Sequence, residues 1–204
     1  MELNNTIFSN DPIQYLAPSW DDMDHLVFSI SRKIIEDGLQ FDRIVTMAKG
    51  GWPMARPLVD YIQANEVASI GIKLYKGIES RQAEPEVYQD IPVDIVGETI
   101  LLFDDVADTG ETLEFVKKYL EGRGVKKIYT ATLFYKPHSS ITPDYFGAET
   151  IAWIIFPYEL RETMDVLVDK WESEGLNEAT IVDRFETLGF KRKMIEYFYS
   201  TLYK

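Results

Sequence analysis

The sequence predicts an α/β protein in which helices flank a parallel sheet. Its 204 residues suit one domain with an appendage. Short apolar runs alternate with segments of helical periodicity between about residues 40 and 160. Polar or glycine-rich loops follow these runs, as they do at the carboxyl ends of parallel strands. We therefore expect a core over residues 1–160 and a helical C-terminal extension over residues 161–204.

The first part of the chain predicts one long helix and one strand–loop–helix unit. Ser19 can cap a helix from Trp20 to about Asp37, which has an apolar face and is followed by Gly38. Arg43–Met47 is the first expected strand. A Gly-Gly loop then leads into a helix over residues 52–61 that carries a proline in its first turn.

The middle of the chain predicts two further strands separated by an irregular stretch. Ala68–Tyr75 reads as a strand, and the apolar run Ile100–Phe103 is typical of a strand buried on both faces. Between them, residues 76–96 are rich in Glu, Gln and Pro and too long for a simple connection. Long loops of this kind are usually functional lids or disordered segments.

The second half continues the alternation and ends in helices. We expect a helix over Glu111–Glu121, a strand over Lys127–Phe134, a loop over Ile141–Glu149 and a final strand over Ile151–Glu159. Three more helices should follow: Leu160–Ser173, a second that starts at Asn177 and ends at Gly189, and an aromatic third around residues 194–202. This extension should dock on the core or on a second subunit.

Composition excludes several classes of function. Acidic residues outnumber basic ones, 34 to 21, which gives a net charge of −13 and argues against a nucleic-acid-binding surface. The chain has no cysteine, so it has neither disulfides nor thiolate metal sites. No apolar run approaches membrane-spanning length, and residues 1–5 lack signal-peptide character. We expect a cytoplasmic protein that binds neither nucleic acid nor membrane.

The most informative stretch follows the buried strand Ile100–Phe103. The acids Asp104 and Asp105 end the strand, and the turn from Asp108 to Thr112 is small and polar. This turn lies at a helix N-terminus, where free backbone N–H groups and the helix dipole favour an anion. The acidic pair suits sugar hydroxyls or a hard cation such as Mg²⁺. The stretch therefore fits a ligand that carries phosphate, a diol and a metal ion together.

This stretch resembles the motif that binds phosphoribosyl pyrophosphate (PRPP) in the type I phosphoribosyltransferases. That motif has an apolar run, two acids, two apolar residues and then Asp-Thr-Gly-x-Thr. The resemblance implies a Rossmann-like parallel sheet with a mobile hood loop, here about residues 71–97. It implies that PRPP contacts Asp104, Asp105, Asp108, Thr109, Gly110, Glu111 and Thr112. Asp104 and Asp105 would hold Mg²⁺, and Asp108 would be the general base.

Two further loops have counterparts in the family. Ala48, Lys49, Gly50 and Gly51 would form the loop that holds the pyrophosphate part of PRPP, with a non-proline cis peptide at Ala48–Lys49. The hood would close over PRPP during the reaction. Four residues of the hood are candidates for contact with phosphate: Lys73, Tyr75, Lys76 and Arg81.

Three residues resemble the base-binding elements of the 6-oxopurine enzymes. Lys136, in a Lys-Pro context at the end of a strand, would donate to the purine O6. Trp153 would stack on the purine, and the backbone of Ile154 or Ile155 would contact the base edge. Glu159 would hold a second Mg²⁺. Ile155 and Phe156 replace a polar pair that is common here, so recognition of the exocyclic groups is expected to differ.

The resemblance implies a purine salvage enzyme that joins phosphoribose from PRPP to a purine. The products are a nucleoside monophosphate and pyrophosphate, and a homodimer is usual in the family. The base expected is a 6-oxopurine: hypoxanthine, guanine or xanthine. The apolar pair after Ile154 leaves adenine as an alternative. A third reading is a non-catalytic regulator that senses PRPP, although such regulators usually carry a basic nucleic-acid surface and this chain is acidic.

Overall fold

The computed structural model describes residues 3–76 and 83–203. By its contacts the chain divides into two compact units, one of residues 23–151 and the other of residues 1–22 together with 152–204. Each unit has its own hydrophobic core. These contacts group residues 152–160 with the C-terminal helices. The expected division of the chain by function, between residues 160 and 161, is not tested by this grouping and stays a prediction.

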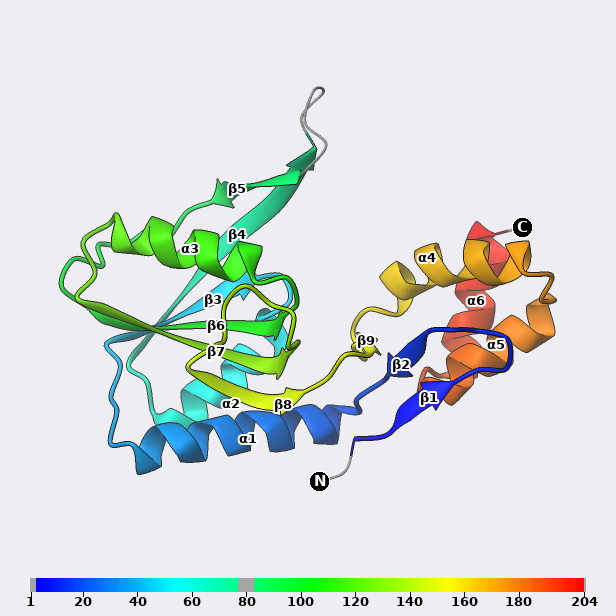
Figure 1. The fold of residues 1–204 in the computed structure, drawn as a ribbon, viewed down its shortest axis with the longest axis horizontal. Helices are drawn as coiled ribbons and strands as arrows, with labels where there is room; N and C mark the ends of the chain where they lie inside the picture. Colours follow the sequence, from blue (N-terminus) through cyan, green and yellow to red (C-terminus); the bar gives the residue numbers. More distant parts are fainter. Residues whose placement is uncertain (1–2, 77–82, 204) are drawn as a thin grey trace. The chain divides into compact units, whose positions relative to one another are not determined.

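A six-stranded sheet forms the centre of the unit of residues 23–151, counted over its described residues (Figure 1). Its order is β5-β4-β3-β6-β7-β8, and all neighbours are parallel except β4 and β5. The strands are β3 (Arg43–Ala48), β4 (Glu66–Lys76), β5 (Ala83–Gln89), β6 (Thr99–Ala107), β7 (Lys127–Tyr135) and β8 (Tyr145–Glu149). The predicted α/β fold with a parallel sheet is confirmed.

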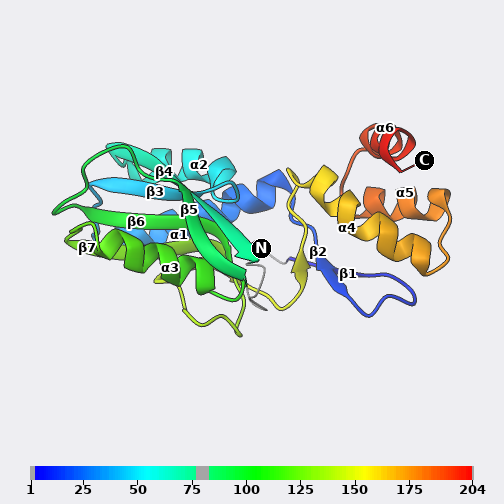
Figure 2. The ribbon, with the colours of Figure 1, turned by 90° about the horizontal axis from the view of Figure 1, so that it is seen from above.

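Helices cover both faces of this sheet (Figure 1). α3 (Glu111–Glu121) packs on one face, and its apolar residues share a buried cluster with residues of β3 and β6. α1 (Trp20–Glu36) and α2 (Trp52–Ile62) lie on the opposite face. Successive side chains of a strand point to opposite faces. The run Ile100–Phe103 is therefore apolar at every position and wholly buried. Figure 2 shows its strand, β6, between β3 and β7.

Helix starts follow from local side-chain chemistry. Ser19 Oγ accepts a hydrogen bond from the Asp22 N–H at 3.1 Å, and the Asp22 carboxylate accepts one from the Ser19 N–H at 2.8 Å. This reciprocal arrangement is a capping box at the start of α1. At the start of α5 (Glu178–Thr187), Asn177 Oδ1 accepts from the Thr180 N–H at 2.9 Å. The cap predicted at Ser19 and the helix start predicted at Asn177 are both confirmed.

The structure corrects three expectations about strands. Residues 141–149 are not wholly a loop, because they contain β8, which pairs with β7. The stretch of residues 76–96 contains β5, which pairs with β4. The strand expected over Ile151–Glu159 is wrong for most of its length: β9 covers Trp153–Ile154 and pairs with β2 (Gln14–Leu16). In each case the hydrogen-bonding partner lies elsewhere in the sequence.

In its described residues, the second unit combines a small sheet with three helices. The sheet has the order β1-β2-β9, with β1 at Asn5–Ile7, and the helices are α4 (Leu160–Ser173), α5 and α6 (Arg192–Leu202). These helices confirm the predicted helical character of residues 161–204. Among the described residues, no helix is long and apolar enough to cross a membrane.

Asp11 lies buried in the core of this second unit. Its carboxylate accepts hydrogen bonds from Tyr15 Oη at 2.7 Å and Trp171 Nε1 at 3.0 Å, and Lys170 Nζ lies 3.0 Å away. Burial alone would raise the pKa of Asp11, but these bonds, with one from the Ile13 N–H, hold that pKa below its ordinary range. Asp11 thus links residues from both ends of the chain.

Candidate active site

The loop after β6 surrounds a cavity of about 230 Å³ lined by residues of the segment 104–113. β6 ends at Ala107, and α3 starts at Glu111, so Asp108, Thr109 and Gly110 form the turn. Gly110 has a φ of +85°, and a Cβ there would lie 2.4 Å from Ser139 Oγ. The turn therefore requires glycine both for its backbone conformation and for its packing. This arrangement confirms the predicted strand, turn and helix N-terminus.

Asp104 and Asp105 line this cavity from within β6, which continues beyond them to Ala107 rather than ending at the acidic pair as expected. The Asp105 N–H donates to Asp104 Oδ1 at 3.0 Å. Burial raises the pKa of the Asp104 carboxyl well above its usual range, and the neighbouring charge of Asp105 adds to the shift. Asp105 is only 7% exposed. The two acids are thus held side by side against the protein, where they line the cavity.

The loop after β3 lies against the same acids. β3 and β6 are parallel neighbours, so their carboxyl ends meet at one edge of the sheet. A Cβ on Gly50 would lie 2.3 Å from Asp105 Oδ2, and one on Gly51 would lie 2.6 Å from Thr46 Oγ1. Both positions therefore require glycine for close backbone approach. The Ala48–Lys49 peptide bond is cis, as expected, and Lys49 is exposed.

Asp108 lies between two basic side chains. Lys136 Nζ lies 3.0 Å from Asp108 Oδ2, and His138 Nε2 lies 3.0 Å from Asp108 Oδ1. The side chain of Lys136 is only 13% exposed, so its charge is largely enclosed beside this carboxylate. The sequence predicted Asp108 and Lys136 for one site, and the structure brings them together.

The sequence reasoning missed His138. The chain has only two histidines, and His138 directly follows Lys136-Pro137. That position next to a predicted site residue was the one sequence feature that could have pointed to it. Its partner is 30 residues away in the sequence, so the pairing depends on the parallel strands β6 and β7. The turn after β7 closes with the Ser139 N–H donating to the Lys136 carbonyl at 2.9 Å. Pro137 occupies the turn position that favours proline.

The predicted hood is partly described. Its two sides are the antiparallel strands β4 and β5, and residues 77–82, which include Arg81, lie outside the described residues. Lys73 Nζ lies 4.8 Å from the centre of the Tyr88 ring, a cation–π distance. The expected phosphate contacts of Lys73, Tyr75, Lys76 and Arg81, and any closure of the hood, stay predictions.

Trp153, Ile154 and Glu159 belong to the unit of residues 1–22 and 152–204. The Trp153 ring lies 5.8 Å from that of Tyr15, and Ile154 is buried. Glu159 precedes the first turn of α4, where its carbonyl accepts from the Thr163 N–H at 2.8 Å. The base-binding roles of Trp153 and Ile154 and the metal-binding role of Glu159 stay predictions.

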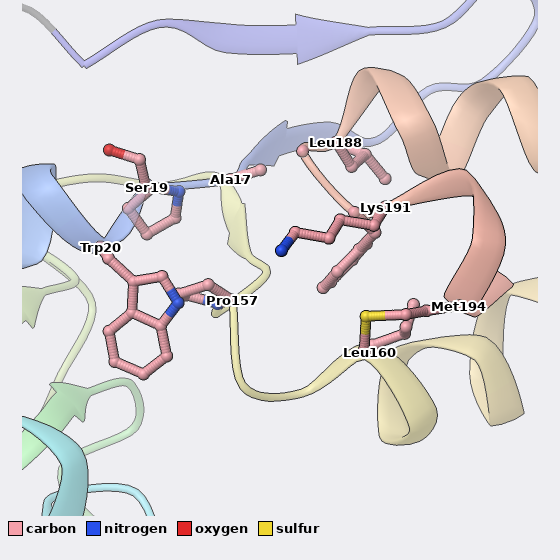
Figure 3. A pocket seen from close by; sticks show the side chains of 11 residues that line it. Ala17, Ser19, Trp20, Pro157, Leu160, Leu188, Lys191 and Met194 are labelled. Carbon is pink, nitrogen blue, oxygen red and sulfur yellow. The ribbon is translucent and has the colours of Figure 1, made fainter.

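This unit also contains a cavity of about 380 Å³ (Figure 3). Figure 3 shows Trp20 and Pro157 on one side and Met194 on the other, with Lys191 extending its ammonium group between them. Among the described residues, the lining includes none of the predicted site residues.

Comparison with known proteins decides the family. A family model described as the phosphoribosyl transferase domain matches residues 18–163. The chain belongs to the phosphoribosyl transferase family. This confirms the resemblance drawn from the motif at residues 104–112.

Individual phosphoribosyltransferases are similar to this chain in sequence and in structure. A xanthine-guanine phosphoribosyltransferase of Gluconobacter oxydans is 26% identical over 149 residues, which span 72% of this chain and 86% of the relative. One of Ruegeria sp. is 29% identical over 154 residues, spanning 70% and 84%. The crystal structure of a purine phosphoribosyltransferase from Pyrococcus horikoshii is similar with a TM-score of 0.63. It is 33% identical and covers 71% of this chain and 91% of that one.

Phosphoribosyltransferases of this type are expected to use Mg²⁺, and the donor set fits that ion. Asp104 and Asp105 place hard carboxylate oxygens beside the cavity. Mg²⁺ is usually held by one or two carboxylates together with substrate phosphates rather than by a cage of protein ligands. Within the described part of the chain, no cluster of three or more acidic or histidine side chains is placed to hold a metal.

Proposed function

We propose that this protein transfers phosphoribose from PRPP to a 6-oxopurine, which yields a nucleoside 5′-monophosphate and pyrophosphate. The observation that carries the proposal is the position of Asp108. It lines the cavity of the PRPP motif and at the same time contacts Lys136, the residue expected to recognise the base. One carboxylate thus connects the sugar-phosphate site with base recognition.

The turn from Asp108 to Thr112 would hold the 5′-phosphate of PRPP. It supplies backbone N–H groups at the start of α3 and the hydroxyls of Thr109 and Thr112. Asp104 and Asp105 accept hydrogen bonds from the ribose hydroxyls. These contacts fix the position of C1′, whose bond to pyrophosphate breaks as its bond to the purine nitrogen forms.

The loop of residues 48–51 would stabilise the departing pyrophosphate. Gly50 lets this loop pack directly against Asp105, and Lys49, which is exposed, supplies a positive charge. Asp104 and Asp105 would hold Mg²⁺, which when bound neutralises negative charge on the pyrophosphate. The residues of this loop therefore act on the leaving group rather than on the base.

Asp108 and Lys136 would act on the base. Lys136 donates to the carbonyl O6, and Asp108 accepts the proton that the purine loses near N7. The names of the relatives support a 6-oxopurine, since two of them are xanthine-guanine enzymes. Recognition of O6 by an ammonium donor disfavours adenine, which presents an amino group at that position.

A single assay tests this proposal. The purified protein is incubated with PRPP, Mg²⁺ and, in turn, hypoxanthine, guanine, xanthine and adenine, and release of pyrophosphate is measured. We expect turnover with at least one 6-oxopurine and much less with adenine. Turnover restricted to adenine would show the alternative base, and no turnover with any base would reject an enzymatic role.

We further propose that activity requires Mg²⁺, that the protein is a homodimer and that it acts in the cytoplasm. The family membership supports the first two, and the third follows from the expected role in purine salvage. Addition of a chelator should abolish turnover, and light scattering should give twice the chain mass of 23.6 kDa. Fractionation of the source cells should recover the protein with the cytoplasm.

A further inference from the structure

We infer that His138 is a positioning residue for Asp108, and that it fixes the orientation of the carboxylate that takes the proton from the base. This inference rests on the proposed function, because it assigns a role within that reaction. The observation that carries it is the pairing of each Asp108 oxygen with a different donor. Lys136 Nζ is 3.0 Å from Oδ2, and His138 Nε2 is 3.0 Å from Oδ1.

A carboxylate bound through one oxygen remains free to rotate about its last side-chain bond. Two donors on different oxygens fix the plane of the carboxylate, as bidentate partners do. This matters for Asp108 because its side chain is 51% exposed, so burial does not fix its orientation. His138 therefore adds a constraint that the turn of residues 108–110 lacks.

Lys136 alone is a poor anchor for this carboxylate. In the proposed reaction its ammonium group also donates to O6 of the purine, so its position depends on the bound base. His138 is not needed for O6, and its contact with Oδ1 persists while Lys136 engages the base. The hydrogen bond to Asp108 forms with a neutral or an ionised imidazole, provided that Nε2 carries a proton to donate.

Backbone hydrogen bonds hold the turn that carries His138 next to Asp108. The Lys136 N–H donates to the Ala107 carbonyl at 3.0 Å, and the Ser140 N–H donates to the Thr109 carbonyl at 2.7 Å. These two bonds tie the turn that carries His138 to both sides of Asp108. The ring of His138 is itself 59% exposed, so the core does not require it for packing.

Steady-state kinetics with PRPP and the preferred 6-oxopurine test the inference. We expect His138→Ala to lower kcat about tenfold with the KM for PRPP unchanged, because proton transfer depends on orientation. His138→Gln should recover most of the loss, since its amide reaches a similar place and donates to Oδ1. His25→Ala is the matched control, because His25 is the other histidine and lies exposed on α1. Its kcat should equal that of the wild type.

A double variant separates a role through Asp108 from an independent one. In an Asp108→Asn background, adding His138→Ala should produce no further loss, because residues that act as a unit are not additive. The same tenfold loss in both backgrounds would overturn the inference, and so would an unchanged kcat in His138→Ala. Thermal melting of each variant shows whether it is folded under the conditions of the assay.

An NMR measurement reads the contact without relying on activity. The ring nitrogen signals of the two histidines are assigned with the His25→Ala variant. Asp108→Asn should shift the His138 Nε2 signal and leave His25 unchanged. If that shift is absent, the contact and the inference are both wrong. If the NMR shift shows the contact but the wild type turns over no base, the proposed function fails. The role of His138 in the reaction then fails for that separate reason.

Discussion

Gly50→Ala is the sharpest test of the loop assigned to pyrophosphate. The added methyl carbon would lie 2.3 Å from Asp105 Oδ2, 2.7 Å from Oδ1 and 2.6 Å from Cγ. Rotation of the carboxylate does not relieve this overlap, because all three of its atoms are too close. Asp105 is only 7% exposed and has little room to withdraw. The loop and the carboxylate must therefore separate.

The size of that separation sets the expected effect. An ordinary contact would need at least 3.4 Å, so the loop has to move by about 1 Å relative to Asp105. A misplacement of about 1 Å in a positioned group costs about a hundredfold in rate, which corresponds to about 2.7 kcal/mol of transition-state stabilisation. We expect kcat/KM for PRPP to fall by about that factor, measured as initial rates of pyrophosphate release.

Gly122→Ala provides the matched control. Gly122 follows α3 with a φ of −62°, and an added Cβ would lie 3.3 Å from its nearest neighbour, the Tyr119 carbonyl. This variant should keep kcat/KM within about twofold of the wild type. Circular dichroism is used to check that both variants are folded. A folded Gly50→Ala protein with wild-type kcat/KM would refute the assignment of this loop.

Three further predictions concern single side chains. Asp108→Asn should lower kcat by about 10²- to 10⁴-fold while calorimetry gives unchanged PRPP affinity, and undiminished turnover would reject Asp108 as the base. Lys136→Ala should reduce kcat/KM for hypoxanthine far more than for adenine, and equal losses would argue against a contact with O6. Asp11→Asn should lower the free energy of unfolding by about 3 kcal/mol at pH 7, since it removes a buried carboxylate that is paired and hydrogen-bonded. Because the pKa of Asp11 is lowered in the folded protein, its stabilisation is complete above the unfolded pKa of about 4 and is lost as the pH falls further. Denaturant titrations should therefore show a weaker loss of stability below pH 4 in the variant than in the wild type.

Local signals account for what the sequence predicted well. The helix Glu111–Glu121 has the predicted bounds, because the motif before it and the glycines after it mark both ends. The helix Leu160–Ser173 likewise follows from a strong apolar periodicity. The loop around Asp108 was predicted because its residues match the family motif at every constrained position.

Long-range pairing accounts for what the sequence did not predict. Tyr145–Glu149 is a strand because β7 supplies its hydrogen-bonding edge, which no local pattern reveals. Of the final strand expected over Ile151–Glu159, the structure forms Trp153–Ile154, the two residues that pair with β2. His138 is identified only when the fold brings it to Asp108. The grouping of residues 1–22 with the C-terminal helices depends on contacts such as those of Asp11 with Trp171.

The central claim is that residues 104–112 bind the phosphate and the diol of an activated sugar. A crystal structure with a 6-oxopurine nucleoside 5′-monophosphate tests it most directly. We predict that the phosphate lies on the backbone N–H groups of residues 109–112, with the ribose hydroxyls at Asp104 and Asp105. A ligand bound anywhere else on the protein, with this turn empty at saturating concentration, would contradict the account.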